Sequence, residues 1–253
     1  MKTLKLILIG LLLTSQAWAG GSRDFDGTDD KISFGDVAVV DSATTITFSQ
    51  WVKHDTQTAD KQLLDKRVVA SDNGVILIRD DVGSSSGRTD CYKWYVGESS
   101  GTGNAFIETA TDSATSGVWR YVTVLFTENV AGGLGIYING VQDANSPVTT
   151  SGIIGIDGGA ATLQIGLTQA STNDFDGNMF NFEVWSIALS PVLINEAMWK
   201  PEFVPQSHIL ESPLFGNASP ELDLSGNART GTATGTTEST DGPPIMFGGG
   251  LPL

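Results

Sequence analysis

The sequence predicts an all-β protein made of two stacked antiparallel sheets, and three observations support this class. Apolar and polar residues alternate in short runs, as at 31–34, 46–49 and 119–126. Gly, Ser, Thr, Asn and Asp separate such runs at intervals of roughly ten residues, which is the spacing of an antiparallel sandwich. No long helical periodicity interrupts the pattern between residues 23 and 187.

Further strands are predicted at 134–138, 163–167 and 180–184, and Asn139-Gly140 supplies a hairpin turn after the first of them. One short helix follows the last strand, because Ser190 can cap it and Pro191 suits its first position. Residues 201–253 are rich in Pro, Gly, Ser and Thr and show little periodicity, so an irregular tail is expected there.

Residues 1–19 have the pattern of a secretory signal peptide. Lys2 and Lys5 precede an apolar run at 6–13, and Ala17-Trp18-Ala19 forms a small-x-small cleavage site. The run is about 8 residues long, whereas a membrane span needs roughly 20. We therefore expect an extracellular or cell-surface protein, with the periplasm as a further location, and no insertion into a membrane. The alternative is an uncleaved apolar arm that packs on a neighbouring subunit.

The charge and cysteine content narrow the range of partners. The formal net charge is −15, and such a chain repels nucleic acids and anionic lipid surfaces, which require Lys and Arg for binding. Glycans, cations and other proteins remain as partners. Cys91 is the single cysteine, so the chain forms no internal disulfide, and we expect this residue to be buried. With two distant histidines it cannot make a structural zinc site.

Several blocks, taken in order, resemble a LamG-like jelly-roll domain of the concanavalin A-like lectin-glucanase superfamily. These blocks are residues 25–34, 47–53, 119–124, 136–141 and 175–185, and Ala188-Leu189-Ser190 with the short helix closes the pattern. The resemblance implies a two-sheet antiparallel jelly-roll sandwich over residues 20–200. One departure is Asn181, where the family usually has Asp, so no charge is inferred at that position.

The tail carries a second resemblance to the same family. Residues 222–232 resemble a segment that usually precedes the first block in these domains. The termini of a domain are often close in space, so the segment can move from one end of the chain to the other at little cost. We therefore predict that residues 208–235 pack back on the sandwich like a permuted first strand. The alternative is a disordered tail.

A repeated tetrapeptide is the candidate metal site. Asp-Phe-Asp-Gly occurs at 24–27 and again at 174–177, and the resemblance implies that these blocks lie on neighbouring strands. Calcium prefers carboxylate and carbonyl oxygens on loops. The candidate calcium ligands are Asp24, Asp26, Asp29, Asp174 and Asp176. The alternative is that each Asp-Gly forms a turn and the acids face water.

No set of residues in the sequence completes a catalytic motif. Glu221 and Asp223 begin the Glu-x-Asp-x-x-Glu pattern of related jelly-roll glucanases, but Gly226 stands at its third position. Asp24-x-Asp26-x-x-Asp29 keeps this spacing with shorter side chains and a turn inside it. His54 and His208 have no Ser or Cys nucleophile motif nearby, so both are expected at the surface or at a sheet edge. We predict no catalytic residue.

Aromatic residues supply the remaining signal. Trp94 and Tyr95 point to opposite faces of a strand, so one of them is expected to face away from the core, where it could stack on a sugar. The predicted function is a secreted, non-catalytic module that binds carbohydrate or a cell-surface glycoconjugate, with help from calcium. The alternatives are a self-associating structural or adhesive subunit of an appendage, surface layer or virion, and a polysaccharide-active enzyme.

Overall fold

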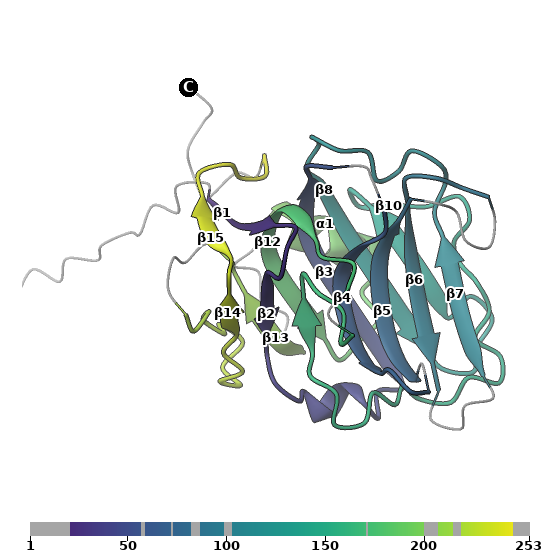
Figure 1. Cartoon of the computed structure of the whole chain (residues 1–253). Helices are drawn as coiled ribbons and strands as arrows, with labels where there is room; N and C mark the ends of the chain where they lie inside the picture. Colours follow the sequence, from purple (N-terminus) through teal and green to yellow (C-terminus); the bar gives the residue numbers. More distant parts are fainter. Residues whose placement is uncertain are drawn as a thin grey trace, which may run out of the picture.

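Two antiparallel sheets face each other across one core in the computed structural model (Figure 1). The structure describes residues 21–56, 59–71, 73–81, 87–98, 103–170, 172–199, 207–214 and 219–244. The signal peptide predicted at 1–19 lies outside these residues. The predicted all-β class and the two-sheet jelly-roll sandwich are confirmed.

Sheet A is built around the long strands β3 and β12, which pair along most of their length. β1 pairs with the first part of β12, residues 176–179, and β13 pairs with its last part, residues 182–185. The order in sheet A is β10 (Val141–Gln142), β9 (Leu134–Ile138), β8 (Arg120–Thr127), β3 (Thr45–His54), β12 (Asp176–Trp185), β1 (Ser22–Asp26) and β15 (Thr237–Ser239), with β13 (His208–Ser212) as the additional strand on β12.

Sheet B has seven strands among the described residues, and four of them follow one another in the chain as a meander. The order in sheet B is β14 (Thr232–Thr234), β2 (Lys31–Ser33), β11 (Gln164–Ile165), β4 (Lys61–Val68), β5 (Asn73–Asp80), β6 (Cys91–Gly97) and β7 (Asn104–Glu108). A short 3-10 helix, η1 (Ala38–Val40), follows β2 and contributes Val40 to the core.

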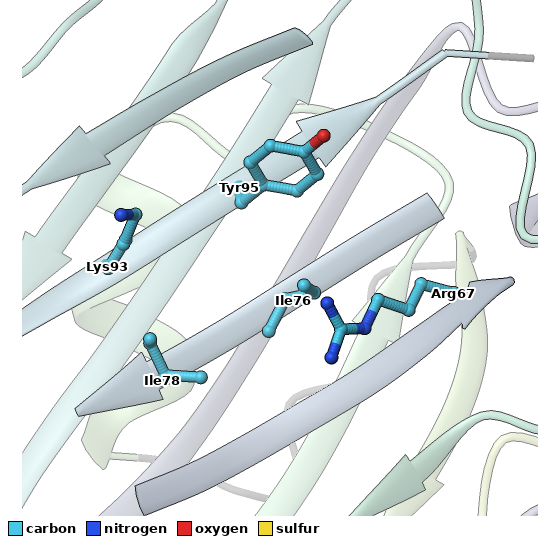
Figure 2. A pocket seen from close by; sticks show the side chains of 5 residues that line it. All are labelled: Arg67, Ile76, Ile78, Lys93 and Tyr95. Carbon is cyan, nitrogen blue, oxygen red and sulfur yellow. The ribbon is translucent and has the colours of Figure 1, made fainter. Parts of the chain in front are cut away.

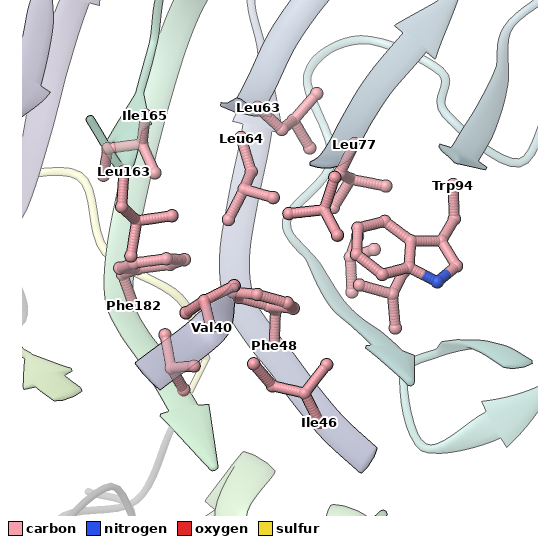
Figure 3. Packing of buried hydrophobic residues seen from close by; sticks show 14 of the residues in the cluster. Val40, Ile46, Phe48, Leu63, Leu64, Leu77, Trp94, Leu163, Ile165 and Phe182 are labelled. Atoms are coloured by element: carbon pink, nitrogen blue, oxygen red, sulfur yellow. The ribbon is translucent and has the colours of Figure 1, made fainter. Parts of the chain in front are cut away.

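The core lies between the sheets and follows the period-two pattern of the sequence. In β8, Val122, Val124 and Phe126 face inward. Figure 3 shows Phe48 of sheet A and Trp94 of sheet B close together in this core, and their ring centroids are 5.6 Å apart. Each fully buried apolar side chain of this size stabilises the fold by roughly 1.5–3 kcal/mol. Cys91 is buried, as predicted, and burial raises the pKa of its thiol to about 12.

A second, smaller apolar cluster lies on the outer face of sheet A. The helix α1 (Pro191–Trp199) starts after Ser190, whose Oγ accepts a hydrogen bond of 3.3 Å from the Leu193 amide. The inward face of α1 packs on aromatic residues of β3, β8, β9 and β12, which include Trp51 and Tyr121. Within the described part of the chain, this is the one α-helix, and no helix has the length and apolar character to cross a bilayer.

A β-bulge in β12 explains the residue that departs from the family pattern. Phe180 pairs with Trp51 and Glu183 pairs with Ser49, so two residues of β12 stand opposite one residue of β3. Asn181 lies in this bulge with φ 50°, in the left-handed region that Asn adopts more readily than most residues. The backbone amide of Asn181 donates a 3.0 Å hydrogen bond to the carbonyl of Pro213.

The C-terminal segment contributes strands to both sheets. β13 and β15 extend sheet A, and β14 pairs with β2 at the edge of sheet B. Arg23 of β1 and Glu221 form a buried ion pair, with 2.8 Å between Arg23 Nε and Glu221 Oε1. Asp241 accepts a 2.9 Å hydrogen bond from Trp119 Nε1 and also binds Lys53. The described residues between 207 and 242 are thereby attached to the sandwich at several points.

Candidate ligand-binding site

The outer face of sheet B presents an open surface. Within the described part of the chain, α1 covers sheet A and no helix lies over the outer face of sheet B (Figure 1). In β6, Tyr92, Trp94 and Val96 point into the core, so Lys93 and Tyr95 point outward. The pairing of β4 to β7 places Asp65, Ile76, Tyr95 and Phe106 in one row across this face.

A shallow hollow of about 220 Å³ lies on this face. Figure 2 shows Tyr95 and Lys93 on β6, Ile76 and Ile78 on β5, and Arg67 on β4, all around the same depression. The isoleucines form an apolar floor, and the Tyr95 ring rises beside them. Phe106, which is 39% exposed, stands next to Tyr95 on the edge strand. The surface therefore combines a flat aromatic ring, apolar contact area and charged hydrogen-bond donors.

Two buried carboxylates hold the two cations of the hollow. Lys93 Nζ lies 3.2 Å from Glu108 Oε1 and 4.8 Å from the centroid of the Phe106 ring. Arg67 Nε lies 3.5 Å from Asp65 Oδ2. Burial raises the pKa of Asp65 to about 6, although the Gln169 amide, which donates to Asp65 Oδ2 at 3.0 Å, and Arg67 both oppose this rise. Asp65 is thus mostly ionised at neutral pH.

Trp94, predicted as a ligand contact, belongs to the core. Its side chain is fully buried against Phe48, and its Nε1 donates a 3.2 Å hydrogen bond to the carbonyl of Leu125. Because neighbouring residues of a strand face opposite sides, the inward position of Trp94 puts Tyr95 outward. Tyr95 alone of this pair lies on the open surface.

The candidate calcium residues fall into two groups. Asp26 and Asp29 form a cluster with Asp30, and their carboxylate oxygens lie within 4.8 Å of one another. Gly27, with φ 77°, makes the turn that brings these acids together. Asp30 was not among the predicted ligands, although it directly follows Asp29. It is buried, and its Oδ2 accepts a 2.7 Å hydrogen bond from the Asp26 amide.

The other predicted ligands lie near this cluster but outside it. The antiparallel pairing of β1 with β12 places Asp26 opposite Asp176 and Asp24 opposite Asn178. Asp24 accepts a 3.1 Å hydrogen bond from Asn178 Nδ2. Asp174 precedes β12, and burial followed by repulsion from Asp29 and Asp26 raises its pKa, although Lys61 opposes this.

Repulsion among the acids of this edge also affects the half-buried Asp24 and the buried Asp30. Burial raises the pKa of Asp24, and the nearby Asp55 carboxylate adds to the effect. Burial is also the main cause that raises the pKa of Asp30, and repulsion from Asp26 and Asp29 adds to it. The atoms that these acids offer to a metal are all oxygens, which fits a hard cation such as Ca²⁺. Three carboxylates supply part of the six to eight oxygens that calcium takes, so loop carbonyls and water would have to complete the set.

A buried polar cluster lies where β13 meets β12, and sequence reasoning missed it. Glu183 and Glu211 are neighbours across the two strands, and His208 Nε2 is 3.4 Å from Glu183 Oε1. Glu183 Oε2 accepts hydrogen bonds from Ser49 Oγ at 3.2 Å and from Tyr121 at 3.3 Å. Both glutamates are buried, so a polysaccharide cannot reach this carboxylate pair, and the geometry does not form a glycosidase site.

The two histidines are buried rather than exposed at the surface. His208 nevertheless lies at a sheet edge, since β13 pairs with β12 alone among the described strands. His54 ends β3 beneath Phe175 and Tyr92, and its Nε2 is 3.2 Å from Tyr92 Oη. Burial lowers the pKa of His54 to about 3, so it is neutral. His208 stacks on Trp185 with ring centroids 4.8 Å apart, and burial lowers its pKa too. His54 continues the alternation of the core residues Phe48 and Val52, so the pattern of β3 could have indicated its burial. His208 begins β13 in a segment with little periodicity, so no such signal was present.

The acids of the incomplete glucanase pattern have structural roles. Glu221 binds Arg23, as described above. Asp223 accepts hydrogen bonds from the backbone amides of Glu211, Ser225 and Arg229, at 3.1, 2.9 and 2.8 Å. These bonds outweigh burial and lower the pKa of Asp223. It therefore stays ionised and orders the loop after β13.

The two-sheet sandwich and its uncovered sheet face define a lectin-like jelly-roll protein. The family model described as the concanavalin A-like lectin/glucanases superfamily matches residues 26–195. The chain belongs to this superfamily, and the resemblance seen in the sequence is confirmed. The match begins at the end of β1 and ends inside α1, so β13, β14 and β15 lie beyond it.

Solved structures with the same fold come from distant proteins. A candidate carbohydrate binding protein from Bacteroides ovatus is 20% identical, with a TM-score of 0.67 over 90% of this chain and 61% of its own. This chain thus spans about three fifths of that protein. A heptameric SAP-like pentraxin from Limulus polyphemus is 18% identical, with a TM-score of 0.53 over 71% of this chain and 82% of its own. At such identities the likeness shows the fold alone. The search of curated proteins gave no match.

Proposed function

We propose that this protein is a secreted, non-catalytic binding module for carbohydrate or for the glycan of a cell-surface glycoconjugate. The ligand would lie on the outer face of sheet B. The observation that carries the proposal is the hollow around Tyr95, where an aromatic ring, an apolar floor and two cations meet on a surface that no described helix covers.

The chemistry of this surface suits sugars. One face of a sugar ring is apolar and stacks on an aromatic ring, while its hydroxyls need hydrogen-bond donors and acceptors nearby. At about 220 Å³ the hollow is smaller than the roughly 300–1,000 Å³ of pockets that enclose drug-sized ligands. A shallow site of this size accommodates one or a few units of a chain that lies across the sheet. The carbohydrate binding named for the Bacteroides ovatus protein agrees with this ligand class.

Binding on an oligosaccharide array tests this function. The wild-type protein should bind glycans, and Tyr95→Ala should weaken binding at least tenfold because it removes the stacking ring. The matched control is Trp199→Ala, since Trp199 is also an exposed aromatic residue but packs near Trp51 on the opposite sheet. If wild-type protein binds no glycan, or if Tyr95→Ala binds as well as wild type, the proposal is wrong.

We further propose that calcium assists by ordering the turn between β1 and β2. The carboxylates of Asp26, Asp29 and Asp30 support this role, since bringing three acids within 4.8 Å is unfavourable unless a cation or protons offset their charge. Calcium that binds only the folded protein should raise the melting temperature. Asp29→Asn should reduce this increase, whereas Asp112→Asn, at an exposed acid on another loop, should retain it. An equal melting temperature with calcium and with a chelator would exclude the site.

A second candidate function is self-association into a surface layer or appendage. Among the described strands, β7 and β10 end sheets B and A, so each has one edge without a neighbouring strand. Val141 in β10 is 71% exposed. Unpaired strand edges of this kind join sheets of different molecules. Size-exclusion chromatography separates the two functions, because a binding module elutes as a monomer and a layer subunit as concentration-dependent oligomers.

A further inference from the structure

The charged residues at the hollow have the opposite sign to the net charge of the whole chain. The protein carries a formal net charge of −15, with 29 acidic residues against 14 Lys and Arg. Yet among the described residues that line the hollow, the two with a charge are the cations Arg67 and Lys93. An acidic surface with a local cationic site favours a ligand whose own negative charge is local, such as a carboxylate on a neutral framework.

Two acids that pair with these cations lie below the surface. The side chains of Arg67 and Lys93 are 20% and 17% exposed, whereas those of their partners Asp65 and Glu108 are 0% and 1% exposed. A ligand that approaches the sheet therefore meets the guanidinium and the ammonium before these two carboxylates. The buried acids also fix the cations in place, which reduces the entropy lost when a ligand binds.

The two cations stand at opposite ends of the apolar floor. Figure 2 shows Ile76 between Arg67 and Lys93. Arg67 lies in register with Gly74 of β5 and Gly97 of β6, four residues along β6 from Lys93. With strands about 4.8 Å apart and about 3.3 Å per residue, their backbones are roughly 16 Å apart. Lys93 Nζ is held toward Glu108 and Phe106 on β7, on the side of β6 away from Arg67. The spacing therefore suits a chain with a carboxylate on more than one unit.

We propose that the hollow selects oligosaccharides that contain uronic acids. This inference rests on the proposed function and names its ligand class. In this arrangement a sugar ring stacks on Tyr95 above Ile76 and Ile78, and carboxylates of separate units bind Arg67 and Lys93. The planar guanidinium of Arg67 can donate two parallel hydrogen bonds to one carboxylate, which the ammonium of Lys93 cannot do.

Matched pairs of ligands test the inference. Tetrasaccharides of galacturonate, glucuronate and mannuronate are each titrated calorimetrically into the full chain, both as free acids and as methyl esters, which keep the framework without the charge. At least one acid should bind ten or more times tighter than its ester. Raising the salt concentration should reduce this preference, since it screens charged contacts.

Variants assign the preference to named residues. Lys93→Met and Arg67→Gln should each lower affinity for the acid and leave affinity for the ester within about twofold. Arg67→Lys keeps the charge, so it should lose less affinity for the acid than Arg67→Gln does. It also keeps the test possible if Arg67→Gln does not fold. Lys31→Met is the control, because Lys31 lies on β2 at the far side of sheet B. A melting curve confirms that each variant is folded.

The outcomes distinguish the inference from the proposed function. Equal affinity for acids and esters, or binding of neutral glycans alone, would overturn the inference and leave the binding module intact. Loss of ester and acid binding together in Lys93→Met would also overturn it, because the lysine would then shape the site rather than select charge. If no glycan of either kind binds, both the inference and the proposed function fail.

Discussion

Removing Glu221 should destabilise the sandwich strongly, although this residue lies beyond the part of the chain that matches the family. Its carboxylate binds Arg23 of β1, and both side chains are buried. Burial raises the pKa of Glu221, and Arg23 opposes this rise by favouring the charged form. Glu221→Gln keeps the shape of the side chain but removes the charge that Glu221 places against the buried Arg23 guanidinium.

The expected loss follows from the cost of removing one charge of a buried ion pair. Breaking a buried ion pair on one side costs about 3–5 kcal/mol, a large part of the 5–15 kcal/mol that typically holds a domain together. For a protein of this size the melting temperature should fall by roughly 6–20 °C. Unfolding in guanidinium chloride, followed by tryptophan fluorescence, measures the change as a lower midpoint with an unchanged slope.

A double variant provides the control. Arg23→Met with Glu221→Leu removes both charges and keeps apolar volume, so it should recover most of the stability that Glu221→Gln loses. Two results would refute the reasoning. One is a Glu221→Gln midpoint equal to wild type, which would mean that the C-terminal segment does not dock on β1. The other is a double variant less stable than the single one.

Two further predictions concern buried groups. Trp94→Ala should cost about 3–5 kcal/mol of stability, because it opens a cavity beside Phe48. Tyr95→Ala should cost less than half as much, because its ring lies outside the core. Similar denaturation midpoints for the two variants would contradict the assigned faces. Burial, and next the Glu183 carboxylate, raise the pKa of Glu211 from 4.5 to about 7. Between these two pH values the folded protein holds a proton that the unfolded chain releases. The stability that this group contributes therefore falls as pH rises from about 5 to 8. Glu211→Gln should therefore gain up to about 3 kcal/mol relative to wild type over that range, and a pH-independent difference between the two proteins would show that Glu211 does not titrate there.

The fold was predictable because its signal is local. Alternating residues such as Val122, Val124 and Phe126 mark an inward face within a single strand, and turn residues mark where each strand ends. The same alternation separated Trp94 from Tyr95 but could not say which ring faced the core. That choice depends on the strands paired with β6, and on Phe48 of the opposite sheet.

The site was less predictable because its residues meet only through the register of paired strands. Arg67, Ile76 and Lys93 are ordinary members of three separate strands, and nothing within any one strand marks them as neighbours. The polar cluster of Glu183 and Glu211 escaped notice for the same reason, since it forms only when β13 pairs with β12. The acids at 26–30 are the exception, because one turn brings them together within five residues.

The central claim is that the outer face of sheet B is the ligand-binding face. Titration of the isotope-labelled protein with its tightest glycan, followed by backbone amide shifts in NMR spectra, tests this claim most directly. The largest shifts should fall on β4, β5 and β6, around Arg67, Ile76 and Tyr95, with little change in α1. Shifts that cluster on sheet A or α1, with β5 and β6 unchanged, would contradict the account.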